Sequence, residues 1–362
     1  MKTFFKIFLI STLFLTVSCL KEDDGMIYVP PIQGAELKPE VGGPNQPNQV
    51  WVDLSTGNMK MTNRTSWDLG FYTGDQFAVI LNTSALMSAS PVDGYTDLAE
   101  INSTNMAGLM SVVQVANFDP NNINYIDDVR GNYLNDGTVI QEENKIYLIN
   151  MGYNIPDGPF QPGTSYAAGT ARGWKKIKIS SEGNGYRLEY ADLNSTQTNE
   201  IYLDKDENYN FRFFSLVTEQ VMDIQPPKKD WDICFTVFVN HVFDNNGNDN
   251  GSYIYTDFVM SNTMANTGAY EVITTESTLL SDFNDFSGSD VDESLFIYDD
   301  HRAIGSNWRI VPGAILKKDR FYVVKDPNGV LFKLRFIAMS KPDDSDPNLF
   351  WRGYPVFEYD PL

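Results

Sequence analysis

Few residues in this 362-residue chain are of types that carry out chemistry. The sequence holds two histidines, His241 and His301, two cysteines, Cys19 and Cys234, and twelve methionines. It contains no Gly-x-Ser-x-Gly, no His-Glu-x-x-His, no phosphate-binding loop and no dinucleotide fingerprint. A serine or cysteine nucleophile needs a base beside it, and neither histidine lies near a credible nucleophile in the sequence. We therefore predict that the protein is not an enzyme.

Cys19 is the residue whose chemistry the sequence indicates most clearly. It follows a short basic start and an apolar run, Phe4 to Val17, that is too short to span a membrane as a mature helix. Residues 1–18 are therefore predicted to be a secretory signal peptide. A cysteine directly after a small residue at this point resembles a bacterial lipobox, in which the thiol is lipidated and becomes the new amino terminus. We predict a lipid-anchored protein that does not span the membrane.

The residues behind Cys19 indicate a destination. Lys21-Glu22-Asp23-Asp24 resembles the export signal of Bacteroidetes lipoproteins, which places them on the outer face of the outer membrane. Loss of the signal peptide removes two lysines and takes the formal charge from −21 to −23. A polyanion of this kind repels phosphate backbones, so the composition argues against nucleic acid as a partner. The negative charge favours a soluble surface for a tethered protein.

Composition also limits the ways in which the fold is stabilised. If Cys19 carries lipid, Cys234 has no partner for a disulfide, and its strand-like setting, Trp231 to Phe235, predicts a buried small hydrophobic residue. Hydrophobic cores must then stabilise the chain, and its length favours two domains. Residues 19–45 are rich in proline, glycine and asparagine and are predicted to be a flexible tether.

Beyond the tether, short alternating runs bounded by turn residues predict an all-β fold. The clearest case is a hairpin in which Arg320 to Lys325 and Val330 to Phe336 flank the turn Asp326-Pro327-Asn328-Gly329. No long amphipathic helix is evident. Similar strand-like segments recur along the chain; they are residues 50–54, 67–72, 77–82, 145–149, 174–179, 186–190, 211–216, 231–239, 253–260 and 354–359.

An internal repeat divides this pattern into two copies. Five blocks recur in the same order: residues 52–57, 66–71, 145–149, 174–179 and 185–190 correspond to residues 214–219, 230–235, 320–324, 331–336 and 353–359. We therefore predict two copies of one all-β module, at residues 46–200 and 201–362. Four aromatic residues at equivalent positions are predicted to pack in the cores, namely Trp67, Trp231, Tyr147 and Tyr322. The first copy replaces the short hairpin turn by an insertion, Asn154 to Arg172.

These blocks resemble the HmuY-like family of Bacteroidetes surface lipoproteins in a tandem arrangement. The likeness lies in the Trp231-Asp232 strand, the Tyr322 to Phe336 hairpin with Lys333 on its return strand, and the terminal strand Gly353 to Tyr359. It implies an antiparallel β module. It further implies a haemophore, which captures haem at the cell surface and passes it to a TonB-dependent outer-membrane receptor.

The resemblance also implies axial ligands to haem iron, either two histidines or, in relatives, methionines. In the family one histidine falls between the later Trp strand and the final hairpin, and Val311 to Leu316 fill that place here without a histidine. The candidates in this chain are therefore His301, Met264, Met260 and His241, and Met264 is favoured because its surroundings predict a loop. His301 is equally consistent with a solvated surface residue, and methionine is commonly a core residue.

Other interpretations remain open at this stage. Asp244 to Gly251 spaces oxygen side chains as the first half of a calcium loop does, but Tyr255 stands where the distal glutamate belongs, so a hairpin turn is predicted. A surface lipoprotein that binds a glycan or a protein partner is the alternative function, with the aromatic segment Tyr153 to Trp174 as the contact surface. The sequence does not indicate an oligomeric state.

Overall fold

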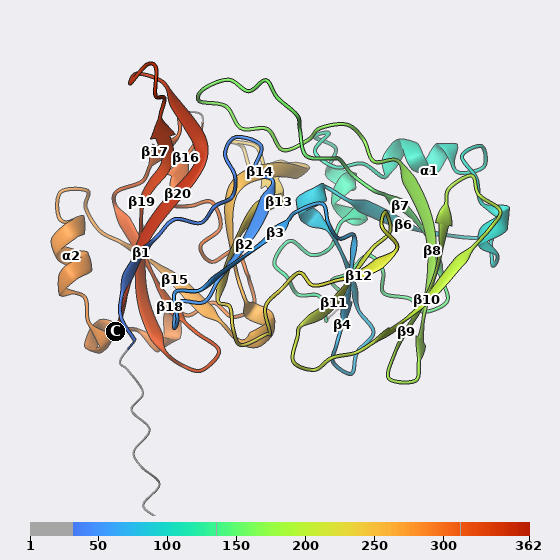
Figure 1. The fold of residues 1–362 in the computed structure, drawn as a ribbon, viewed down its shortest axis with the longest axis horizontal. Coiled ribbons are helices and arrows are strands. Elements are labelled where there is room, and N and C mark those ends of the chain that lie inside the picture. The colour runs from blue at the N-terminus through green and yellow to red at the C-terminus, as the bar shows by residue number, and fades with distance from the viewer. Residues whose placement is uncertain (1–31, 135, 312) are drawn as a thin grey trace, which may run out of the picture. The chain divides into compact units, whose positions relative to one another are not determined.

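Antiparallel β-strands make up most of the structure, a computed structural model that describes residues 32–134, 136–311 and 313–362 (Figure 1). The strands are β1 (Ala35–Leu37), β2 (Asn48–Val52), β3 (Met59–Asn63), β4 (Leu69–Tyr72), β5 (Val79–Leu81), β6 (Ser88–Val92), β7 (Ile146–Asn150), β8 (Trp174–Glu182), β9 (Gly185–Asp192), β10 (Asn199–Asp204), β11 (Phe211–Ser215), β12 (Gln220–Met222), β13 (Ile233–Phe243), β14 (Asp249–Ser261), β15 (Gly268–Ile273), β16 (Arg309–Ile310), β17 (Ile315–Leu316), β18 (Arg320–Lys325), β19 (Leu331–Pro342) and β20 (Phe350–Pro361). The all-β prediction is confirmed.

Helices are few and short in the described residues. They are α1 (Ala107–Val112), α2 (Leu279–Asp285) and the 3-10 turns η1 (Thr83–Ala85), η2 (Leu98–Glu100), η3 (Pro120–Tyr125), η4 (Thr263–Ala265), η5 (Gly288–Asp290) and η6 (Glu293–Leu295). Across the part of the chain that the structure describes, none reaches the length and apolar character needed to cross a bilayer. Cys19 and the predicted signal peptide lie outside the described residues.

The predicted hairpin between β18 and β19 is confirmed, and its turn shows why the sequence specifies it. The Asp326 carboxylate accepts the N–H groups of Asn328 at 2.9 Å and Val330 at 2.7 Å. Gly329 adopts a positive φ of 87°, which a residue with a side chain rarely adopts. The turn between β13 and β14 is built similarly, because Asp244 accepts the N–H groups of Asn246 and Asn248.

Two pairs of sheets repeat one topology. The five-stranded sheets have the orders β1-β20-β19-β18-β15 and β10-β9-β8-β7-β6, and the four-stranded sheets have the orders β3-β2-β13-β14 and β12-β11-β4-β5. When the two pairs of sheets are compared in these orders, β1, β2 and β3 occupy the same positions as β10, β11 and β12. Ala35–Leu37, inside the segment predicted as a tether, therefore serves as an edge strand against β20.

Strands from the two halves of the sequence pair with each other. β2 pairs with β13, so that Val52 lies opposite Ile233, and β11 pairs with β4, so that Phe214 lies opposite Leu69 (Figure 1). The early strands of each predicted sequence copy thus complete a sheet of the other copy. The boundary at residue 200 remains a prediction about the sequence repeat, and the hydrogen-bonded pairs cross it.

We call β2 and β11 the exchanged strands, because each completes a sheet of the other sequence copy. A buried aspartate binds the chain just beyond the end of each exchanged strand. The Asp68 carboxylate accepts the N–H of Leu216 at 2.7 Å, and the Asp232 carboxylate accepts the N–H of Leu54 at 2.7 Å. Both aspartates follow the equivalent tryptophans of the repeat, and both are almost fully buried. Because a buried carboxylate is stable only when its oxygens are hydrogen-bonded, these contacts fix which backbone amide each strand presents.

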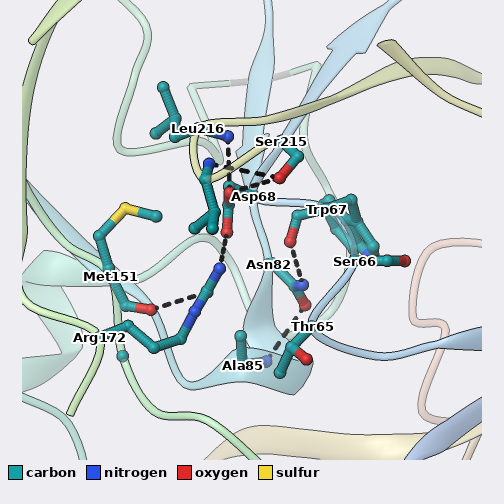
Figure 2. Close-up of polar contacts among 12 residues, drawn as sticks. Thr65, Ser66, Trp67, Asp68, Asn82, Ala85, Met151, Arg172, Ser215 and Leu216 are labelled. Atoms are coloured by element: carbon teal, nitrogen blue, oxygen red, sulfur yellow. Dashed lines mark hydrogen bonds and ion pairs between the residues drawn. The ribbon is translucent and has the colours of Figure 1, made fainter. Parts of the chain in front are cut away.

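The two aspartates differ in their charge environment. Arg172, at the end of the insertion, forms an ion pair with Asp68 at 2.6 Å, and both side chains are buried (Figure 2). Burial raises the pKa of Asp68, and the guanidinium of Arg172 opposes this rise and favours the carboxylate. No cation contacts Asp232 among the described residues. Burial, together with the nearby Asp53 and Asp326 carboxylates, raises the pKa of Asp232 to about 8, so Asp232 is mostly protonated at neutral pH.

Two buried lysines support the predicted repeat in the same way. Lys333 on β19 donates to the carbonyl oxygens of Phe283 at 2.6 Å and Phe286 at 3.0 Å, at the C-terminal end of α2. Lys176, the equivalent residue on β8, donates to the carbonyl oxygens of Ile101 and Ser195. An ammonium group at the C-terminus of a helix is favoured by the helix dipole. The predicted core positions of Trp67, Trp231, Tyr147 and Tyr322 are confirmed, since each is at most 4% exposed.

The insertion in the first copy, Asn154 to Arg172, contacts the N-terminal segment and strands of the second copy. Tyr166 donates its N–H to the carbonyl oxygen of Pro44 at 2.8 Å, and Gly163 donates its N–H to that of Phe350 at 2.7 Å. Ser165 lies 2.9 Å from Thr256 between hydroxyl oxygens. The loop thus connects the N-terminal segment to β14 and β20. Cys234 is fully buried, as predicted, and forms no disulfide within the described residues.

Replacement of Asp68 by asparagine is expected to destabilise the fold. The introduced carboxamide retains an oxygen for the N–H of Leu216 but leaves the buried charge of Arg172 without an anionic partner, because its other contact is the Met151 carbonyl oxygen. Breaking a buried ion pair costs about 3–5 kcal/mol, which urea unfolding measures directly. Asp157→Asn, at an exposed position, is the control and should change the free energy of unfolding by less than about 0.5 kcal/mol. A loss below about 1 kcal/mol for Asp68→Asn would contradict the assigned role.

Asp232→Asn is expected to change the pH dependence of stability. Because the folded-state pKa of Asp232 is raised to about 8, its contribution is full below about pH 4 and is lost as the pH rises toward 8. The loss amounts to at most about 1.4 kcal/mol per pH unit. Urea unfolding at pH 5 and pH 8 should therefore show a smaller decrease for Asp232→Asn than for the wild type. Equal decreases would show that Asp232 is ionised in the folded protein.

Candidate functional site

The two four-stranded sheets meet around an aromatic core that encloses a small cavity. Trp51 and Trp231 pack edge to face with ring centroids 4.8 Å apart, and Trp67 packs against Phe213 in the same way at 4.7 Å. The cavity has a volume of about 50 Å³. It is lined by Gln49, Trp51, Trp67, Ile80, Leu81, Thr83, Tyr133, Asn210, Phe211, Gln225, Trp231, Met260, Ser261, Asn262, Thr263, Met264 and His301. Three of the four candidate ligands predicted from sequence lie on its wall.

A larger groove lies on the other side of Met264. Its volume is about 580 Å³, and it is lined by Tyr72, Thr73, Gly74, Asp75, Glu207, Tyr209, Asn210, Lys228, Lys229, Met264, Ala265 and Asn266. Only Met264 and Asn210 belong to the walls of both the groove and the cavity. The half-buried Met264 side chain therefore forms part of the partition between them.

The turn that carries Met264 is well defined. Met264 lies in η4, where Ala265 donates its N–H to the carbonyl oxygen of Asn262 at 3.0 Å. The Asn262 side chain donates to the carbonyl oxygen of Trp231 at 2.9 Å, and Asn266 ends the turn in the left-handed conformation with φ of 70°. Met264 is thus presented on a short loop, as predicted, and the loop is anchored to the segment just before β13 that carries Trp231.

Met260 lies four residues earlier along the chain, inside β14. It pairs with Cys234 across the β13–β14 ladder and packs against the aromatic core. Its half-buried side chain lines the cavity and not the groove. Met260 is therefore a wall residue of the cavity.

His301 is buried, so its interpretation as a solvated surface residue is wrong. Its ring is only 5% exposed, and Nε2 lies 2.9 Å from the carbonyl oxygen of Val129, to which it donates. A β-carbon on Gly131 would lie 2.7 Å from Nδ1, so Gly131 packs closely beside that nitrogen. Burial lowers the pKa of His301 to about 4 and keeps the ring neutral. Nε2 is therefore not free to bind a metal in this arrangement.

His241 lies apart from the other three candidates. Its Nε2 is 2.8 Å from an oxygen of Asp249, and its ring packs against Phe243 at 4.5 Å between centroids. It faces a separate hollow of about 490 Å³ that also contains Arg130 and Arg302. The structure thus brings Met260, Met264 and His301 together and leaves His241 outside the cavity and the groove.

Sequence reasoning did not identify the polar side chains of the groove. Lys228 and Lys229 precede the second Trp-Asp pair, and Tyr72 and Tyr209 come from different sequence copies. Tyr72 packs against Phe211, with ring centroids 5.9 Å apart. No motif marks these residues, because they meet only when β4 pairs with β11.

His301→Gln is expected to reduce the acid sensitivity of the fold. Because the folded-state pKa of His301 is lowered to about 4, its contribution is full above about pH 6.5 and is lost as the pH falls toward 4. Between pH 7 and pH 5 the wild type should lose about 2 kcal/mol more unfolding free energy than the variant, whose amide can still donate to Val129. Urea unfolding at both pH values measures this difference. The same loss in both proteins would contradict a buried neutral ring.

Comparison with known proteins gives one match. The model of the family described as HmuY protein matches residues 45–359, which is most of the chain. No curated protein matches this chain, and no solved structure matches it. The match covers β2 to β19 and most of β20, including both Trp-Asp pairs and the residues of the cavity and the groove. The chain therefore belongs to the HmuY family.

Proposed function

We propose that this protein binds haem in the groove beside Met264, at the cell surface, and passes it to a TonB-dependent outer-membrane receptor. Membership of the HmuY family supports haem binding at a surface in general. The observation that carries the location is the position of Met264, whose thioether borders the groove of about 580 Å³. Thioether sulfur is an established axial ligand of haem iron.

The dimensions of the two spaces favour the groove over the cavity as the place for haem. A ligand pocket typically has a volume of about 300–1,000 Å³, so the groove has room for a macrocycle, whereas the cavity of about 50 Å³ does not. The donor set points the same way. His301 donates Nε2–H to Val129, and both His301 and Met260 line the cavity and not the groove. Met264 is therefore the one sequence candidate that faces the groove.

Two lysines and two tyrosines of the groove fit the chemistry of haem, whereas Asp75 and Glu207 on the same wall would repel its propionates. Lys228 and Lys229 present ammonium groups that suit the two propionate carboxylates. Tyr72 and Tyr209 provide aromatic surface for the apolar macrocycle. Bound haem would give the protein its visible absorption, and it would be the cargo that a receptor takes up. The protein's own residues would bind and orient it, and no step here requires a catalytic group.

The anchor completes the proposal. Lipidation of Cys19 would tether the protein to the outer membrane and leave residues 33–362, which form one compact unit, outside it. The high net negative charge keeps such a protein soluble at the surface. Release of haem to a receptor would require the bond between the iron and Met264 to break, and the position of Met264 on a short loop permits this.

Haem titration of the protein without its leader, residues 20–362, tests the proposal. We expect a saturable Soret shift in the wild type, and a tenfold or greater loss of affinity with altered bands in Met264→Ala because the thioether is removed. Met264→His should restore an axial ligand. Met59→Ala, at a largely exposed methionine on β3, is the matched control and should bind as the wild type does.

Two results would contradict the haem proposal. Absence of any Soret shift at micromolar haem would remove haem binding itself. Identical binding by Met264→Ala and the wild type would keep haem binding but reject Met264 and the groove as its site.

A further inference from the structure

Three residues that line the cavity each carry a buried polar atom with no hydrogen-bond partner among the described residues. These atoms are Oε1 of Gln225, Nε1 of Trp231 and Oγ of Ser261. The three residues are 7%, 4% and 3% exposed. Buried polar atoms in folded proteins are nearly always hydrogen-bonded, so three unpaired atoms around one small space indicate that something else occupies it.

The chemistry of these atoms defines what fits. The indole N–H of Trp231 donates, the carboxamide oxygen of Gln225 accepts, and the hydroxyl of Ser261 does both. The cavity wall carries no charged side chain, because its only titratable groups are the neutral His301 and the phenol of Tyr133. The remaining wall includes the aromatic rings of Trp51, Trp67 and Phe211. An uncharged group that both donates and accepts hydrogen bonds, attached to an apolar ring face, matches this wall.

The internal repeat shows that the fold does not require this polarity. Leu69 pairs with Leu81 across β4 and β5, and the equivalent Ile233 pairs with Ser261 across β13 and β14. Ser261 therefore stands where the other half of the structure has a leucine. Since the fold accepts a leucine at the equivalent position, folding does not require the Ser261 hydroxyl. Its lack of a hydrogen-bond partner in the structure therefore indicates a ligand.

We propose that the cavity receives the adjacent hydroxyl groups of a neutral sugar that enters from the groove past Met264. The cavity of about 50 Å³ holds three or four water-sized groups, which suits two hydroxyls and the carbons that carry them. The rest of the sugar lies in the groove. One hydroxyl accepts from Trp231 and donates to Gln225, and its neighbour bonds to Ser261. This inference goes beyond haem binding and does not depend on it.

The test uses haem-free protein, residues 20–362, and tryptophan fluorescence, because three tryptophans line the cavity. Glucose, galactose, mannose and N-acetylglucosamine are titrated separately, and calorimetry checks any change. We expect at least one sugar to give a saturable signal. Ser261→Leu, which copies Leu81, should weaken it tenfold or more, and Ser261→Ala should weaken it while leaving the cavity open. Ser289→Leu, at an exposed serine, is the control and should bind as the wild type does.

Unfolding midpoints for each variant separate loss of binding from loss of folding. The proposal is overturned if no sugar saturates the signal, or if folded Ser261→Leu and Ser289→Leu bind equally well. A crystal structure grown with the sugar that shows only ordered water on the three atoms would also overturn it. Failure of haem binding leaves these outcomes unchanged, because haem is absent from every sample.

Discussion

The structure depends on a buried aspartate carboxyl that holds a backbone amide just beyond an exchanged strand. Asp68 holds the N–H of Leu216, and Asp232 holds that of Leu54, each at 2.7 Å. Each contact joins residues more than 140 positions apart in the chain. Because a buried carboxyl tolerates few unpaired oxygens, these contacts select one register for β2 on β13 and for β11 on β4. Arg172 forms an ion pair with Asp68, and no cation among the described residues does so with Asp232. The two aspartates therefore share their backbone contact but differ in their charge environment.

This exchange creates the site. With β2 on β13 and β11 on β4, the two four-stranded sheets share a core of tryptophans, and the cavity remains where the facing side chains do not fill it. Met264 separates that space from the groove because η4 follows β14 directly. The polar atoms that lack partners and the candidate thioether ligand therefore lie at the junction between segments that are distant in the sequence.

Local features of the fold could be predicted from the sequence, and long-range pairing could not. The β18–β19 hairpin follows from alternation and an Asp-x-Asn-Gly turn, and the core tryptophans follow from the repeat. The partner of β2 could not be predicted, because both sequence copies offer an equivalent Trp-Asp strand. β1 carries only three residues, Ala-Glu-Leu, within a proline-rich segment, so no periodicity marks it. His301 was ambiguous because two aspartates precede it, yet tertiary contacts with Val129, Tyr133 and Phe238 bury it.

We propose that haem contacts the protein at Met264. A crystal structure of the haem complex, with the iron located from its anomalous scattering, distinguishes this site from the others. We expect iron in the groove, coordinated by Sδ of Met264, with the propionates toward Lys228 and Lys229. Iron coordinated by His241 in the separate hollow, or by a His301 released from Val129, would contradict it.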